Sequence, residues 1–125
     1  MDCIELKVSA NMNQGLEVRI TDDEIVLALK CIHTTKAHGP DDFHALSFKR
    51  FWHIVRVDII YMVTALWSGS IGFEKINETL IVLISKLSGS VNMIEFRPIS
   101  MCNVIYKIFV KILSPCLRKI HPSVI

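Results

Sequence analysis

Two basic residues, Lys86 and Arg97, flank a segment that predicts a hairpin turn, Leu87-Ser88-Gly89-Ser90. Arg binds phosphate oxygens through a planar fork of donors, whereas Lys acts as a compact point charge. A strand–turn–strand hairpin can hold both on one side, where they could bind a triphosphate. Alternatively, Lys86 ends a strand in water and Arg97 pairs with Glu95 or caps a loop. The residue types alone leave both interpretations open.

The C-terminal part of the chain is basic, although the 125 residues together carry a formal charge of only +2. Residues 1–42 hold four basic and eight acidic side chains, whereas residues 43–125 hold ten basic and four acidic ones. A basic half indicates a polyanion as partner, and the other interpretation is a solvated helix face. The candidates for contact with a nucleic-acid backbone are Lys107, Lys111, Arg118 and Lys119.

The acidic residues do not suggest a catalytic centre. A catalytic site with two divalent metal ions needs convergent carboxylates to hold them. The adjacent aspartates are Asp22-Asp23, which open a predicted helix, and Asp41-Asp42, which lie in a turn. Cysteines and histidines at 31, 33, 38 and 44 match no zinc spacing. We therefore predict neither a catalytic residue nor a metal site.

Composition and the lengths of apolar stretches limit the kind of protein further. Apolar residues make up 51% of the chain, and the four cysteines form no Cys-x-x-Cys pair, which favours free thiols. The longest apolar stretch, residues 59–67, is far below the ~18–20 residues of a membrane span. The start shows no secretory signal. We expect no membrane partner and an intracellular location that the sequence does not specify further.

Periodicity predicts an α+β fold in which helices pack on a small antiparallel hairpin. Residues 1–20 are expected to be an irregular lead-in, and Thr21-Asp22-Asp23-Glu24 has the spacing of a capping box. The apolar, β-branched run at 80–84 predicts a buried strand, whose return through 93–96 ends or reaches an edge at Pro98. Helices are expected over residues 22–33, 43–55, 58–67 and 103–114.

The last predicted helix has a candidate N-terminal capping residue, an apolar face and an internal proline. Asn103 can cap its start, and its apolar stripe comprises Val104, Ile105, Ile108, Phe109 and Ile112. Pro115 predicts a kink or an early end, because it lacks an amide hydrogen and clashes with the carbonyl of Lys111. Helical spacing also makes Phe51, Trp52 and Trp67 core candidates rather than base-stacking residues.

Three segments in order are more specific than any of these features: KAHGPDDF at 36–43, INETLIVLISK at 76–86 and FRPISMCNVIYKI at 96–108. They resemble the start of the reverse transcriptase domain of plant non-LTR (LINE-type) retrotransposons. That family reads roughly KAPGPDGF, INxTxIxLIPK and DFRPISLCNVxYKIxSKxLANRL. The resemblance covers about residues 21–125, and Phe51-Trp52 between the first two segments also fits.

The resemblance implies a partial reverse transcriptase domain over residues 21–125, with the fingers subdomain present and the palm missing. It implies that Lys86 and Arg97 lie near the nucleotide phosphates, and that the parent enzyme binds an RNA template or DNA. The family holds magnesium through later aspartate motifs that these residues do not include, so we expect no cofactor in this fragment. The endonuclease that the family carries upstream is also absent from them.

Departures from the family pattern indicate decay. Asp42 replaces a turn glycine, which is unfavourable where the turn needs a positive φ. His38 and Ser85 replace prolines, and Pro115-Cys116 replaces an Asn-Arg pair. The leading hypothesis is a truncated, catalytically inactive fragment of an RNA-directed DNA polymerase. The alternatives are a domesticated non-catalytic nucleic-acid-binding module and a small helical interaction protein.

Overall fold

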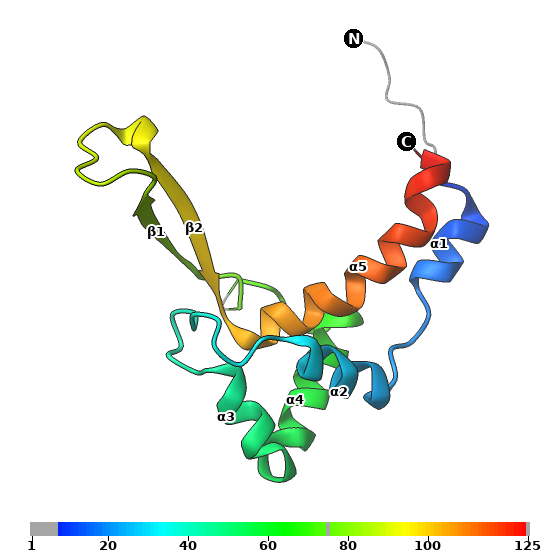
Figure 1. The fold of residues 1–125 in the computed structure, drawn as a ribbon. Helices are drawn as coiled ribbons and strands as arrows, with labels where there is room; N and C mark the ends of the chain where they lie inside the picture. Colours follow the sequence, from blue (N-terminus) through cyan, green and yellow to red (C-terminus); the bar gives the residue numbers. More distant parts are fainter. Residues whose placement is uncertain (1–7, 75, 125) are drawn as a thin grey trace.

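The computed structural model describes residues 8–74 and 76–124, and its fold is α+β. A helical body carries two projecting arms, the hairpin and the C-terminal half of the last helix, and the chain has the outline of a V (Figure 1). The elements are α1 (Ala10–Leu16), α2 (Asp22–Cys31), α3 (Ala45–Arg50), α4 (Trp52–Trp67), β1 (Thr79–Ser85), a 3-10 turn (Met93–Glu95), β2 (Phe96–Cys102) and α5 (Val104–Val124).

The capping box predicted at Thr21 is confirmed. The Thr21 amide donates to Glu24 Oε2 at 2.8 Å, and the Glu24 amide donates to Thr21 Oγ1 at 3.3 Å. Helix α2 ends at Cys31, two residues before the predicted end. The Lys49 ammonium lies at this end and donates to the carbonyls of Lys30 and Ile32, at 3.1 and 2.5 Å. A cation therefore satisfies carbonyls that the helix end leaves without amide partners.

The core lies where α2, α4 and α5 meet. Ile25, Val63, Val104 and Ile108 are almost completely buried there. The predicted stripe of α5 is confirmed, with Ile112 buried and Ile105 packed against the core. Three helices thus bury one apolar face each against the others, which is the usual way a small helical unit excludes water.

The prediction of an irregular lead-in over residues 1–20 is wrong for residues 10–16, which form α1, while residues 1–7 lie outside the described part. Helix α1 begins after Ser9, whose hydroxyl accepts from the Met12 amide at 3.3 Å. The Asn13 side chain then donates to Glu17 Oε1 at 2.8 Å. A cap and a side-chain pair four residues apart therefore support a short helix that has no apolar periodicity.

The predicted boundary between helices at residues 55–58 is also wrong. Helix α4 runs without a break from Trp52 to Trp67, and the interruption lies at Phe51, where φ is −103° and ψ is 25°. No Gly, Pro or capping residue stands between 55 and 57, so nothing there stops the hydrogen-bond ladder. The end predicted at residue 67, before Ser68-Gly69, is confirmed.

The antiparallel hairpin is confirmed, but its predicted packing is not. β1 pairs with β2 from Thr79↔Cys102 to Ser85↔Phe96. All seven residues of β1 are exposed, and the hairpin projects from the body with no helix on either face (Figure 1). The β-branched run sets the strand conformation, but it does not determine which surface covers the strand.

The return strand begins later than predicted, at Phe96, because Met93–Glu95 form a 3-10 turn. Pro98 lies inside β2, opposite Leu83. A two-stranded sheet has two open edges, so a residue without an amide hydrogen fits wherever its nitrogen faces outward. The strand was predicted either to end at Pro98 or to reach a sheet edge there. It reaches an edge and continues past Pro98.

Helix α5 continues through Pro115 and Pro122 to Val124, so the predicted early end is wrong. Pro115 and Lys111 are both exposed, so water can hydrogen-bond the carbonyl that the proline leaves without a donor. The helix bends along this half instead of stopping (Figure 1). Among the described residues, no helix has both the length and the apolar character needed to cross a membrane.

Candidate nucleic-acid interface

The first and third motif segments meet at the base of the hairpin. Gly39 is buried, and a Cβ built on it would lie 2.6 Å from the carbonyl carbon of Cys102 and closer still to Asn103. The Asn103 side-chain oxygen accepts from the Asp41 amide at 3.3 Å. The Lys107 ammonium donates to the Ala37 carbonyl at 2.7 Å. Segments 60 to 70 residues apart in sequence therefore form one close joint.

Asn103 occupies the capping position predicted for it, directly before α5. Its carbonyl accepts from the Lys107 amide at 3.1 Å, which starts the helix. Its side chain is buried, and the bond that it forms is to the turn at Asp41. Asn103 therefore joins the turn to the start of α5.

Asp42 has a φ of 58°, in the left-handed region. This is the condition under which the sequence predicted a penalty for a side chain at this position. The Asp42 carboxylate lies 3.2 Å from His38 Nδ1, and this is the one ion pair among residues 8–74 and 76–124. Both partners reach solvent, so the pair adds little stability.

Lys86 and Arg97 lie on the same face of the hairpin. Ile84 is paired with Arg97, and the Lys86 amide continues the ladder by donating to the Glu95 carbonyl at 2.8 Å. Side chains alternate along a strand, so Lys86, two residues after Ile84, shares the face of Arg97. The Lys86 ammonium donates to the Ile94 carbonyl at 2.8 Å. One of its three donors is used, and two are left for another acceptor.

Glu95 does not pair with Arg97. Its carboxylate accepts from the amides of Val91 and Asn92, at 2.8 and 3.1 Å. The hydrogen bonds from the Asn92 and Val91 amides hold the pKa of this carboxyl below its usual value, because they favour the charged form. Glu95 therefore stabilises the loop at the hairpin tip, and the exposed Arg97 guanidinium has no carboxylate partner within the described residues.

A groove beside α5 gathers three lysines. Its volume is about 580 Å³, and Lys36, Lys107 and Lys111 line it together with the aromatic rings of His33 and Tyr106. On α5, Lys107, Lys111 and Arg118 follow one another at helical spacings of four and seven residues, so they form one row. Lysines beside a half-buried tyrosine are the groups that bind a single strand, through its phosphates and bases.

Lys119 lies apart from this row. It lines a neighbouring groove between α2 and α5, together with Glu24. Lys111 lines both grooves, and the carboxylate of Glu24 makes this second groove less favourable for a polyanion.

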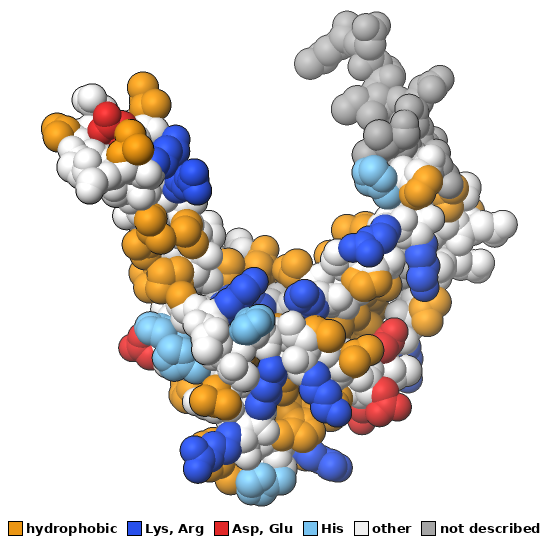
Figure 2. Space-filling view, viewed as in Figure 1, with side chains coloured by type: hydrophobic (Ala, Val, Ile, Leu, Met, Phe, Trp, Pro, Cys, Tyr) orange, Lys and Arg blue, Asp and Glu red, His pale blue; other side chains and the backbone are white. Residues whose placement is uncertain are grey.

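Basic side chains lie on the concave side of the V as well as on the lower part of the helical body (Figure 2). Figure 2 shows blue side chains on the flank of the hairpin that faces α5, across the middle, and along α5. The hairpin between residues 79 and 102 contains no Lys or Arg besides Lys86 and Arg97. The fold therefore places the hairpin pair and the row on α5 around one concave surface.

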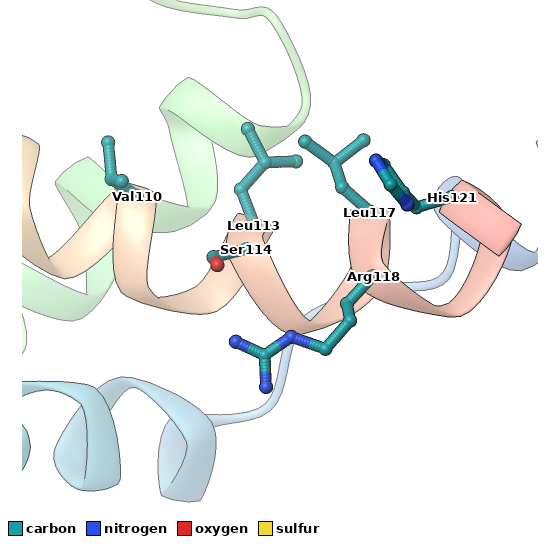
Figure 3. A pocket seen from close by; sticks show the side chains of 6 residues that line it. All are labelled: Val110, Leu113, Ser114, Leu117, Arg118 and His121. Carbon is teal, nitrogen blue, oxygen red and sulfur yellow. The ribbon is translucent and has the colours of Figure 1, made fainter. Parts of the chain in front are cut away.

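Another face of α5 is apolar. Val110, Leu113, Leu117 and His121 project together from the helix, and Arg118 points away from them (Figure 3). These residues line a shallow, open surface rather than a site with convergent polar groups. The apolar row borders the basic row, because Arg118 also lines this surface and Val110 and Ser114 line both this surface and the basic groove.

Sequence reasoning missed Lys36, His33 and Tyr106 as parts of the groove. Lys36 opens the first motif segment and Tyr106 precedes Lys107, but only the joint at Gly39 brings them together. The aromatic residues predicted for the core behave as expected in two cases. Trp52 and Trp67 pack against the core, and Trp67 Nε1 donates to the Val18 carbonyl at 3.1 Å, whereas Phe51 is 47% exposed.

No group of three or more His, Cys, Asp or Glu residues in the described part of the chain is arranged to hold a metal ion. The chain matches no protein-family model, and a search of curated proteins finds no significant match.

Proposed function

We propose that the chain is a fingers fragment of a non-LTR reverse transcriptase that binds single-stranded nucleic acid and does not polymerise. Lys86 and Arg97 bind phosphates at the hairpin. The groove formed by Lys36, Lys107 and Lys111 binds the backbone of the strand. The 125 residues include neither of the family's aspartate motifs, so binding is the activity assigned to them.

The observation that carries the proposal is the contact among the motif segments. The second and third segments pair as β1 and β2, and the first packs on the third through Gly39 and Asn103. Segments that resemble one family in order thus also form one local unit. This unit brings Lys36, Lys107 and Lys111 into one groove and Lys86 and Arg97 onto one face of the hairpin, and all five belong to the motifs or their continuation.

Electrostatics support a polyanion rather than a neutral ligand. No acidic residue follows Glu95 in the sequence, so α5 has no carboxylate of its own to neutralise its row. Phosphate contacts release counterions, and each one steepens the dependence of binding on salt. The decrease of binding affinity with rising salt concentration therefore measures the contribution of these residues directly.

The test combines binding with primer extension. Fluorescence anisotropy of a labelled single-stranded RNA should show binding at low salt that weakens steeply as salt rises. Arg97→Ala and Lys111→Ala should each weaken it and reduce the slope of log K against log[salt] by about 1. Arg56→Ala is the matched control, because Arg56 lines a groove on α4 together with Asp22, away from the concave surface.

Primer extension with magnesium and nucleotides should give no product from the 125-residue chain. Extension would contradict the absence of catalysis. Binding that does not respond to salt, or that Arg56→Ala weakens as much as Lys111→Ala, would contradict the assignment of the surface.

A further inference from the structure

The two edges of the hairpin differ in their capacity to pair with another strand. The Lys86 amide donates to Glu95, so the even-numbered amides of β1 point toward β2 and the odd-numbered ones point outward. Ile81 and Leu83 therefore present amides and carbonyls at an open edge. On β2 the outward positions include Pro98, which has no amide hydrogen, and the charged Arg97 is its neighbour.

We propose that two copies of this chain dimerise by antiparallel pairing of their β1 edges, which gives a four-stranded sheet. The inference does not rest on the proposed nucleic-acid surface, with which this interface shares one residue, Lys86. A two-stranded hairpin is marginal in water, and three or more strands are needed for independent stability. Pairing of β1 with β1 supplies them, and it also shields apolar side chains of which Ile81 is 69% exposed.

Two conditions determine the register of the β1–β1 pair: the number of residues that overlap, and the pairing of odd-numbered residues with odd-numbered ones. Pairing must join odd-numbered residues, since only these have outward amides. A two-fold axis at Val82 overlaps all seven residues of β1, so that Ile81 of one copy faces Leu83 of the other. β1 contains no charged residue, and no like charges meet within it.

Charge complementarity selects the same register. Glu78 precedes β1 and Lys86 follows it, each four residues from Val82. The axis at Val82 therefore places Glu78 of each copy opposite Lys86 of the other. Opposite charges directly across two strands attract each other, whereas like charges there repel. The two symmetric pairs favour this register over slipped ones.

The geometry also limits assembly to a dimer. β1 lies on the outer side of the hairpin, away from α5 (Figure 1). A two-fold axis uses the same edge of both copies, and the free edges of the resulting sheet are the two β2 strands with Pro98. The groove lined by Lys36, Lys107 and Lys111 stays open in each copy.

Sedimentation analysis of the full chain over a concentration series tests the dimer. A reversible shift to twice the monomer mass of 14.2 kDa is expected. Ile81→Pro removes an outward amide without removing a bond to β2, and it should weaken dimerisation about tenfold or more. Ser100→Pro is the matched control, because Ser100 is the partner of Ile81 and its amide faces the edge that Pro98 already blocks.

A charge exchange tests the register with variants that leave the strand intact. Glu78→Lys and Lys86→Glu alone should each weaken dimerisation about threefold or more, and the double variant should restore it. The proposal would be overturned if the chain stayed monomeric at every concentration or formed open-ended oligomers. It would also be overturned if the two proline variants had equal effects, or if the double variant did not restore dimerisation. Each variant is compared only if its circular dichroism spectrum matches that of the parent chain, which shows that it is folded.

Discussion

Gly39 approaches Asn103 so closely that no side chain fits between them. The two residues lie in different motif segments, and their contact fixes the turn at residues 39–42 against the junction of β2 and α5. The Lys107–Ala37 bond of 2.7 Å lies beside this contact and depends on it. The close packing at Gly39 thus holds the two sides of the basic groove together, and the charge pattern of the sequence gives no sign of this role.

Gly39→Ala should destabilise the fold by about 2–3 kcal/mol, because the added methyl group would overlap backbone atoms that cannot move independently. Thermal or denaturant unfolding measures the effect. Gly15→Ala is the control, because a Cβ at Gly15 in α1 meets nothing within 4 Å. It should stabilise by about 0.5–1 kcal/mol through helix propensity. Equal effects of the two substitutions would show that the close approach at Gly39 carries no energetic weight.

Asp42→Gly should stabilise the chain by about 0.5–1 kcal/mol, because glycine adopts a φ of 58° without steric cost. The surface pair with His38 is lost, but such pairs contribute little. Asp41→Gly, the neighbouring control, should destabilise, because the Asp41 carboxylate accepts from the Phe43 amide at 3.2 Å. If unfolding experiments show the same loss for both, the turn at Asp42 is not under strain.

The sequence predicted those elements whose cause is local. The capping box at Thr21, the strand around Val82 and the stripe of α5 each depend on a short run of residues, and each is present. The exposure of β1 was predicted wrongly, since an apolar run looks the same whether or not a helix covers it. At Pro115 the sequence predicted a kink or an early end and could not choose between them, because the cost of continuing depends on whether water reaches the carbonyl of Lys111.

The candidate site was predictable only in part. Lys86 and Arg97 share a face because hairpin register follows from alternation within nearby segments. Lys36 joins Lys107 and Lys111 only through a turn whose partner lies some 60 residues away. Lys119 illustrates the opposite case, since its basic charge suggested a phosphate contact and the fold places it outside the groove of the three lysines, in a groove that Glu24 also lines.

The hairpin tip should respond to acid. The pKa of Glu95 is lowered from an ordinary value of 4.5, so its contribution to the loop is complete above that pH and is lost as pH falls below it. NMR titration should show the Glu95 carboxyl with a pKa below 4.5, and the amides of Val91 and Asn92 should shift with the same midpoint.

Glu95→Gln serves as the control for this titration, because it keeps the side-chain shape and removes the titrating charge. The Val91 and Asn92 shifts should then lose their pH dependence between about pH 3 and 6. A midpoint above 4.5 for Glu95, or unchanged amide titration in the variant, would contradict the assignment of these hydrogen bonds.

The most direct test of the central claim is an NMR titration of the 125-residue chain with single-stranded RNA at low salt. We expect the amide signals around Lys36, Arg97 and Lys111 to shift together and to recover when salt is raised, while those around Arg56 on α4 stay in place. No shifts at the concave surface, or shifts confined to α4, would contradict it.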